Sequence, residues 1–275
     1  MCAVSASVSK KRLRLRRPDR CGVCDHEFAA GDEAIWDRVS RTVTCVGCDV
    51  RRAPVRAGQA GASALREYER RQQRREQRAR ERLGGLGVLL ARVSNEPRTT
   101  TSWQQGGKGE ARTGARLGKL LEGSGVKLLH DRRVSGRGKA NIDHIAIGPG
   151  GVTVIDTKTH RGKIRVQRVG GLFSARRSVL VIGGRDQTSL IDVVERQTEL
   201  VRTALSQIGQ DQIDVRGALC FPYIDGRPIL GHPRVRNTIV DGPRAGARLA
   251  RRPGPLNAET VNRISTHLDH SFPPA

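Results

Sequence analysis

The sequence predicts an α+β fold, with a mixed sheet flanked by helices, for the larger C-terminal part of the chain. Apolar residues repeat at helical spacing over 111–121, and three β-branched runs follow within 126–158. Two Cys-x-x-Cys pairs and a basic segment precede this region. We therefore expect four successive parts, which are a basic, disordered tail at 1–20, a small cysteine module at 21–50, a basic helical or disordered linker at 51–104, and the α+β domain at 105–270.

The first element of the domain is a predicted helix at 111–121, where alanines and leucines share one face. Glu110 then lies in the first turn, where an acid complements the helix dipole. The alternative is that Glu110 is a carboxylate that faces a metal. The glycines at 106–109 lack the spacing of a phosphate-binding loop and the Lys-Ser/Thr that completes one, so we reject that interpretation.

The remaining elements are predicted from the same two patterns, which are helical spacing of apolar residues and short β-branched runs typical of strands. Strands are expected at 126–129, 142–147, 152–158, 163–166, 178–181, 215–221 and 238–240, and helices at 191–205 and 258–268. The sequence Gly148-Pro149-Gly150-Gly151 is a strong turn signal, so the second and third strands should form a hairpin.

This hairpin gathers residues with the chemistry of a metal site. Asp143 and Asp156 come to the same end of adjacent strands, and Lys158 shares a face with Asp156 because side chains alternate along a strand. Two carboxylates beside an ammonium suit Mg²⁺ or Mn²⁺ and a water to be activated, as in a metal-dependent phosphodiesterase. The alternative is a surface ion pair. His144 points to the opposite face and should pack or hydrogen-bond.

The charge of the chain favours a polyanionic partner. There are 50 Lys and Arg residues against 27 Asp and Glu, a formal net charge of +23. Nucleic acid is the first candidate and an anionic membrane surface the second. A coding sequence rich in G and C would explain why arginine is used in place of lysine. It would not explain why basic residues outnumber acidic ones. Aromatic residues make up only 3%, so base stacking is not expected to dominate nucleic-acid contacts.

Nothing in the sequence resembles a membrane or export segment. No stretch approaches the roughly 20 apolar residues that span a bilayer. The basic N-terminus is not followed by the apolar core of a signal peptide. We expect a cytoplasmic protein.

The two cysteine pairs predict a zinc site. Cys21 and Cys24 form one Cys-x-x-Cys turn, Cys45 and Cys48 the other, and two such turns complete a tetrahedral Zn²⁺ site. A small hairpin between the pairs would cover the metal. The module either contacts DNA as a zinc ribbon or is purely structural. Cys220 lies in an apolar run and should be buried.

The basic connector is predicted to begin at Ser63, which would cap a helix extending to about Leu83. Its residues are almost wholly charged, so it is either a solvated helix or a disordered segment. It serves either as a spacer or as a phosphate contact. The glycines at 84–87 should end it, and residues 94–106 should form a second, polar linker.

Residues of about 105–222 resemble the nuclease-related domain family, NERD, within the PD-(D/E)xK superfamily, which has a restriction-endonuclease-like core. The matching motifs are Gly109-Glu110, Leu129-His130-Asp131, Asn141-Ile142-Asp143-His144, Gly148-Pro149-Gly150-Gly151-Val152 and Ile155-Asp156-Thr157-Lys158. Ile142 stands where the superfamily's name has proline, a change common in the nuclease-related family.

The resemblance implies a role for each residue. Asp143 and Asp156 would hold the divalent ion, and Lys158 would orient or help to deprotonate the attacking water. Glu110 would be an auxiliary ligand or base, and Gln197 a supporting polar residue.

The leading hypothesis is therefore a Mg²⁺- or Mn²⁺-dependent nuclease that hydrolyses phosphodiesters, with DNA as the expected substrate. The second is a DNA- or RNA-binding protein that keeps the fold without catalysis. The third is an interaction module whose zinc ribbon docks another protein.

Overall fold

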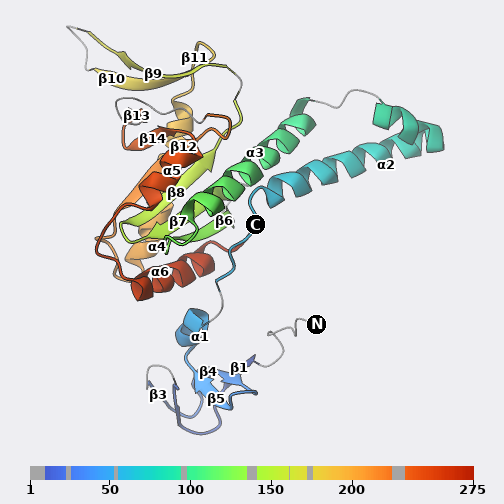
Figure 1. Ribbon diagram of the computed structural model, residues 1–275. Helices are drawn as coiled ribbons and strands as arrows, with labels where there is room; N and C mark the ends of the chain where they lie inside the picture. The colour runs from blue at the N-terminus through green and yellow to red at the C-terminus, as the bar shows by residue number, and fades with distance from the viewer. Residues whose placement is uncertain are drawn as a thin grey trace. The chain divides into compact units, whose positions relative to one another are not determined.

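The computed structural model of the chain describes residues 10–22, 26–52, 55–93, 98–134, 141–160, 162–171, 176–224 and 233–275. The chain divides into two compact units, Met1–Val55 and Arg56–Ala275 (Figure 1). The larger unit contains the α+β domain, and the smaller unit contains the cysteine pairs.

A six-stranded mixed sheet forms the centre of the larger unit, with the strand order β13-β14-β12-β8-β7-β6. Its strands are β6 (Lys127–Arg133), β7 (Asn141–Gly148), β8 (Gly151–Thr157), β12 (Val215–Cys220), β13 (Arg234–Val235) and β14 (Thr238–Asp241). The first three form the predicted antiparallel meander, while β8, β12 and β14 run parallel. The predicted α+β class with a mixed sheet is confirmed.

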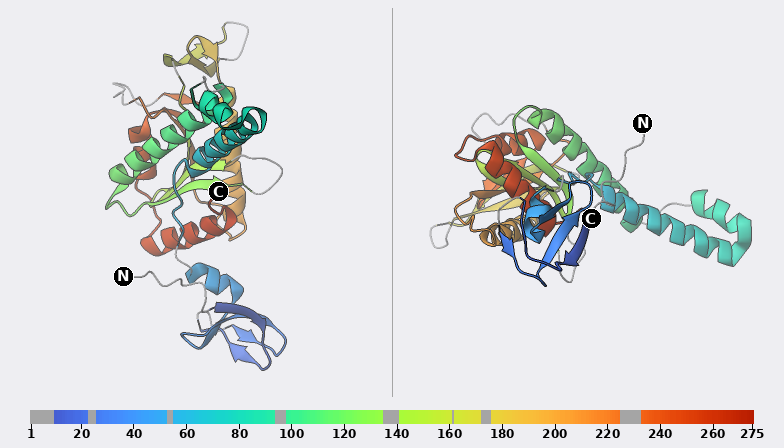
Figure 2. Two further views of the ribbon diagram at one scale, coloured as in Figure 1. Left: turned by 90° about the vertical axis from the view of Figure 1, so that its right-hand side faces the viewer. Right: turned by 90° about the horizontal axis from the view of Figure 1, so that it is seen from below.

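Helices cover both faces of this sheet (Figure 2). On one face, α3 (Arg98–Leu121) and α5 (Pro243–Ala250) pack against buried residues of the strands, among them Ile155 and Ala218. On the other face, α4 (Ser189–Ser206) packs against β8 and β12. The closing helix α6 (Ala258–Ser271) packs against α4 and the β6–β7 edge.

The helix α3 is longer than the sequence predicted. It begins at Arg98, so the expected linker is wrong for residues 98–106, and residues 94–97 lie outside the described part. Glu110 consequently lies in the middle of the helix, and its expected place in a first turn is wrong. Glycine weakens a helix, but a Cβ on Gly107 would come within 2.9 Å of Leu65 and one on Gly109 within 2.1 Å of Thr159. Close packing at these positions therefore outweighs the low helix propensity of glycine.

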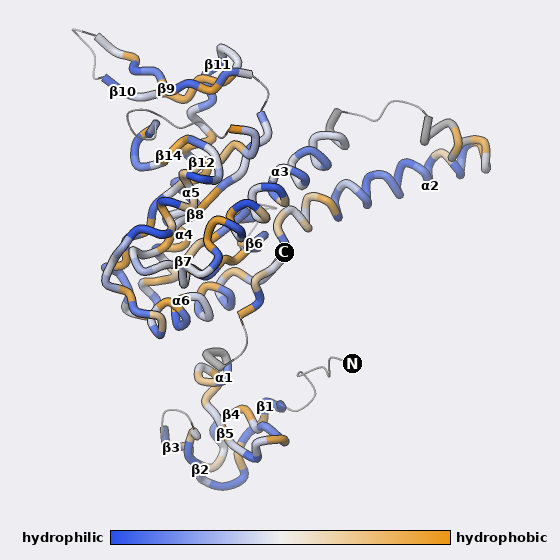
Figure 3. The backbone as a smooth tube through the Cα atoms, viewed as in Figure 1, coloured by the Kyte–Doolittle hydropathy of each residue, from blue (hydrophilic) through white to orange (hydrophobic). Residues whose placement is uncertain are grey.

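The basic connector is helical. The helix α2 (Ala62–Val93) packs against α3 and breaks at Leu83 and Gly84, where Gly84 has φ +59°. The first helical segment therefore ends at the glycines, as predicted, and a second helical segment follows the break. The half-buried face of α2 includes Tyr68, Gln72 and Arg75. Because these side chains are polar or amphipathic, the sequence of α2 shows no apolar periodicity. In Figure 3 the middle of α2 is hydrophilic, whereas its two ends include more apolar segments.

The start of α2 is held by a residue far away in the sequence. Asp131 on β6 accepts hydrogen bonds from Ser63, from the backbone nitrogen at 2.6 Å and from the hydroxyl at 2.7 Å. Asn141 Nδ2 donates to the same carboxylate at 2.9 Å. Ser63 was predicted to be the cap, but the carboxylate of Asp131 satisfies the first N–H groups instead.

A buried ion pair joins three segments of this unit. Arg132 on β6 is fully buried and donates to Asp269 on α6 at 2.9 Å and to the carbonyl of Phe272 at 3.2 Å. It also donates to the carbonyl of Arg56, and Arg56 itself donates to Asp269 at 3.2 Å. The segment before α2, the edge of the sheet and the C-terminal helix are thereby fastened together.

A second, three-stranded sheet consists of β9 (Ile164–Val169), β10 (Arg177–Ile182) and β11 (Arg185–Asp186). Apolar residues on one of its faces, including Leu180 and Ile182, are buried against α4 and the end of the central sheet. Several arginines remain exposed on β9 and β10. No helix among those described is both long and apolar enough to cross a bilayer.

The smaller unit contains a three-stranded sheet of β1 (Lys10–Arg14), β4 (Glu33–Asp37) and β5 (Thr42–Thr44). The short strands β2 (Asp19–Arg20) and β3 (Glu27–Phe28) form a second ladder, and α1 (Val46–Arg52) follows. The predicted hairpin between the cysteine pairs is β4–β5. The predicted tail is wrong for residues 10–14, because β1 pairs with β4 and gains its hydrogen bonds there.

We predict that Asp269→Asn destabilises the larger unit by about 3 kcal/mol, since it leaves the buried Arg132 charge uncompensated. Urea unfolding followed by circular dichroism measures the loss. The control is Glu199→Gln, which removes an exposed i,i+3 pair with Arg202 and should cost less than about 0.5 kcal/mol. Equal midpoints for the two variants would contradict the role assigned to Arg132.

Candidate functional site

The hairpin of β7 and β8 sets the geometry of the site. Gly148 pairs with Gly151 across a two-residue loop, and His144 pairs with Ile155, so the next position places Asp143 opposite Asp156. Gly151 has φ +112°, and a Cβ there would lie 2.3 Å from the carbonyl oxygen of Asp214. The turn therefore requires glycine at position 151. The two-residue turn then fixes the register in which β7 pairs with β8.

Four of the predicted site residues meet at the carboxyl end of β8. Asp156 Oδ2 lies 2.6 Å from Lys158 Nζ, and Asp143 Oδ2 accepts the backbone N–H of Thr157 at 2.7 Å. Gln197 Nε2 lies 3.5 Å from Asp156 Oδ1 and donates to the carbonyl of Asn141 at 3.1 Å. Asp156 is 2% exposed and the Lys158 side chain 29%, so the cluster is buried on one side and open on the other.

Glu110 joins this cluster from α3. Its pKa is raised to about 7, first by burial and then by the negative charges of Asp131 and Asp156, while Lys158 opposes the rise. The mid-helix position, which the sequence did not indicate, brings this carboxyl close enough to interact with the charges at the end of β8. All five predicted residues therefore belong to one electrostatic unit.

The charges of this unit are unbalanced. Burial raises the pKa of Asp143 well above its usual range, and repulsion from Asp156 and Glu110 adds to it. Burial lowers the pKa of Lys158, but attraction from Asp156, Asp143 and Glu110 outweighs it and raises that pKa. One ammonium thus faces three carboxyl groups, so a further cation is favoured.

The residues present fit a magnesium or manganese ion. Among the described residues, Asp156 Oδ2 accepts no aligned hydrogen bond and has only the Lys158 ammonium close to it, and the buried Gln197 Oε1 has no partner. Carboxylate and amide oxygens are the ligands that these ions prefer. Asp143 and Asp156 would hold the ion, as the sequence predicts.

A histidine pair lies on the other face of the same strands. His144 Nδ1 is 2.9 Å from His130 Nδ1, and His144 Nε2 is 3.3 Å from Thr157 Oγ1. Burial lowers the pKa of both imidazoles, so both are neutral and one donates to the other. The prediction that His144 packs or hydrogen-bonds is confirmed. His130 could have been found from the strand register alone.

In the smaller unit, three thiols converge. The ligand sulfurs of Cys21, Cys45 and Cys48 all lie within 4.8 Å of one another, and Cys45 N–H points to Cys21 Sγ at 3.3 Å. This arrangement could hold zinc, which prefers thiolates in tetrahedral sites. Cys24, the predicted fourth ligand, lies outside the described residues. Cys220 is buried in β12, as predicted.

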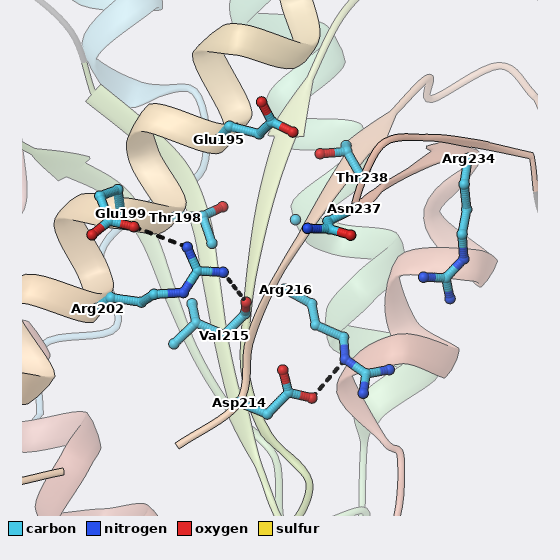
Figure 4. A pocket seen from close by; sticks show the side chains of 11 residues that line it. Glu195, Thr198, Glu199, Arg202, Asp214, Val215, Arg216, Arg234, Asn237 and Thr238 are labelled. Carbon is cyan, nitrogen blue, oxygen red and sulfur yellow. Dashed lines mark hydrogen bonds and ion pairs between the residues drawn. The ribbon is translucent and has the colours of Figure 1, made fainter. Parts of the chain in front are cut away.

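A cavity of about 580 Å³ lies outside the carboxylate cluster (Figure 4). Val215 and Gly217 line it, near the start of β12 and therefore away from the end that carries Lys158. Its arginines are largely paired, since Arg216 contacts Asp214 at 2.6 Å and Arg202 contacts Glu199 at 3.0 Å. Its charges compensate one another, and no catalytic constellation forms there.

Comparison with known families identifies the domain. Residues 105–222 match the family model described as NERD, nuclease-related domain. The matched segment contains Glu110, Asp143, Asp156, Lys158 and Gln197, so this chain carries a nuclease-related domain with the whole cluster inside it. Searches of curated proteins and of solved structures found no match.

We predict that the stability of the metal-free protein falls as the pH rises from about 4.5 to about 7. Glu110 has its folded pKa raised from 4.5 to about 7, so in this window the folded state binds more protons than the unfolded state. Mg²⁺ binds the ionised carboxylates and should therefore raise the melting temperature more at pH 8 than at pH 5.

Thermal unfolding at both pH values, with and without Mg²⁺, measures this effect. Glu110→Gln should weaken the pH dependence, and the exposed Glu122→Gln is the matched control. An equal Mg²⁺ effect at the two pH values would count against a carboxylate metal site.

We predict that the smaller unit binds one zinc ion and depends on it. Cys45→Ser should abolish zinc binding measured by atomic absorption, whereas Cys2→Ser, outside the pairs, should leave it unchanged. Trp36 packs against the cysteine cluster, so its emission should shift to the red when a chelator removes the metal. Zinc retained at full stoichiometry in Cys45→Ser would refute the assignment.

Proposed function

We propose that the nuclease-related domain is a Mg²⁺- or Mn²⁺-dependent nuclease acting on phosphodiesters, with DNA as its substrate. The observation that carries this proposal is the cluster at the end of β8. There, the Lys158 ammonium lies 2.6 Å from Asp156 and is also attracted by the carboxyls of Asp143 and Glu110, and two buried oxygens lack aligned donors. This excess of acidic oxygens favours a divalent cation and is hard to explain as a purely structural device.

Each residue has a role in this proposal. Asp143 and Asp156 hold the ion, which when bound supplies a more acidic water and a positive charge for the developing phosphate charge. Lys158 orients the attacking water and offsets negative charge near the reacting phosphate. Glu110, with its pKa raised to about 7, accepts a proton near neutral pH. Gln197 positions Asp156 by contacting both that carboxylate and the carbonyl of Asn141.

The charge distribution supports a nucleic-acid substrate. Beside the second sheet, a cavity of about 570 Å³ is lined by Arg176, Arg177, Arg234 and Arg236. Among the described residues, only Arg236 of these four forms ion pairs, with Asp192 and Glu195. Unpaired arginines at the surface suit phosphate contacts. In the proposed organisation, 105–270 is the nuclease domain, while the cysteine module and α2 add further nucleic-acid contacts.

The second candidate function is nucleic-acid binding without catalysis. It is favoured by the ion pair at 2.6 Å, in which the Lys158 ammonium already supplies Asp156 with a counter-charge. A cluster neutralised in this way would be stable without a metal. Binding would then depend on salt but would be indifferent to Mg²⁺ and to Asp143→Asn.

We predict that Asp156→Asn and Lys158→Ala each lower the rate of DNA cleavage at least a hundredfold, because the first weakens the proposed metal site and the second removes a positive charge at the reacting phosphate. Affinity for DNA, measured by fluorescence anisotropy in EDTA, should change by less than about threefold, since the basic surfaces supply it. Asp214→Asn, at the distant cavity, is the matched control. If the zinc-loaded wild type cleaves no single- or double-stranded DNA or RNA with Mg²⁺ or Mn²⁺, the nuclease proposal fails.

A further inference from the structure

A smaller cavity of about 300 Å³ borders the carboxylate cluster. It is lined by residues of α2, α3, β6 and β7, and Asn141 forms part of its wall. Asn141 and Asp143 are two positions apart on one strand, so their Cα atoms are about 7 Å apart and their side chains share a face. The carbonyl of Asn141 also accepts the Gln197 amide that contacts Asp156. The cavity and the cluster are therefore neighbours.

The lining of this cavity is positively charged. Arg66, Arg70 and Arg133 line it together with Glu67 and Ala275, whose carbonyl oxygen accepts a hydrogen bond from Arg66. The carboxylate of Glu67 is already shared between Arg70 at 2.7 Å and Arg71 at 2.8 Å. In the part of the chain that the structure describes, no carboxylate pairs with the exposed Arg133. An anion entering the cavity would find a charge that the protein has not neutralised.

The cavity also contains an aromatic side chain. Trp103 is one of only two tryptophans in the chain, and it lines the cavity from α3. The guanidinium of Arg71 lies over its ring, 5.4 Å from the centroid. A tryptophan next to arginines provides a surface for a planar base together with donors for a phosphate. The cavity of about 580 Å³ at the start of β12 has no aromatic lining, and neither has the arginine-rich cavity beside the second sheet.

We propose that this cavity binds one nucleotide that flanks the scissile phosphodiester, with the base against Trp103 and a phosphate on Arg133. The inference rests on the proposed nuclease function, because the position of the cavity beside Asp143 gives the nucleotide its role. A volume of about 300 Å³ is comparable to that of one nucleotide. The substrate class is therefore single-stranded nucleic acid or a frayed end, since a base inside an intact duplex must first leave its stack.

Most of this cavity is built by residues outside the matched nuclease-related segment. Arg66 and Arg70 come from α2 and Trp103 from the early part of α3, all before residue 105. The ion pair of Arg132 with Asp269 and the cap of α2 by Asp131 hold these elements in place. The preference for unpaired nucleotides is thus a property that this chain adds to the domain.

Trp103 fluorescence tests the proposal directly. In Trp36→Phe, Trp103 is the only tryptophan, so its quenching reports occupation of the cavity. A five-nucleotide single-stranded oligonucleotide, added in EDTA to prevent cleavage, should quench it saturably. Inorganic phosphate, and a blunt duplex that contains the same sequence and is long enough to stay paired, should bind at least tenfold more weakly. Trp103→Phe in the native background should abolish the saturable quenching, which assigns that quenching to Trp103, and circular dichroism checks that Trp36→Phe is folded.

The variants assign the contacts. Arg133→Gln should weaken oligonucleotide binding by roughly tenfold, while Arg168→Gln, an exposed arginine on β9, should change it less than twofold. Trp103→Ala should also lose affinity, and Trp103→Phe should keep most of it, with binding then followed by anisotropy of a labelled oligonucleotide.

The proposal is overturned if the single strand causes no saturable quenching, if the duplex or phosphate alone binds equally well, or if both arginine variants lose the same affinity. Because binding is measured without metal, the two proposals fail separately. If the single strand quenches Trp103 specifically but the protein cleaves no substrate, the proposed nucleotide site is supported and the proposed nuclease function is rejected. If the protein cleaves nucleic acid but Trp103 fluorescence does not respond, the proposed nucleotide site is rejected and the proposed nuclease function is retained.

Discussion

The pairing of β7 with β8 is the constraint on which the site depends. A two-residue loop between Gly148 and Gly151 fixes the register and sets Asp143 against Asp156 in a buried environment. Two adjacent carboxylates away from water repel each other and lose hydration, so they need compensation. Lys158 and the backbone N–H of Thr157 provide part of it. The proposed divalent cation would compensate the remaining negative charge.

The elements around this hairpin are held by polar contacts between residues far apart in the chain. Arg132 joins β6 to α6 and to the segment before α2, and Asp131 on the same strand caps α2. Buried ion pairs add less to stability than to the definition of one arrangement, because every alternative leaves a charge unpaired. Here that arrangement sets α2 and α3 beside Asn141 and so forms a basic cavity next to the cluster.

Packing also explains the composition of the two long helices. Glycines in the middle of α3 allow Leu65 and Thr159 to approach, which brings Glu110 over the end of β8. The stems of polar and charged side chains on α2 cover α3 while their ends remain in water. The high positive charge of the chain is therefore compatible with ordered helices, and much of it stays exposed for a polyanion.

The sequence by itself determined the α+β class, the β7–β8 hairpin, the facing pair Asp143 and Asp156, and the convergence of cysteines near the N-terminus. These features follow from strand alternation, turn residues and motif spacing, which act over a few neighbouring residues. Only the tertiary structure decided the length of α3, the cap of α2 and the position of Glu110. Each of these depends on a contact with a segment distant in the chain, and packing there outweighs local propensity.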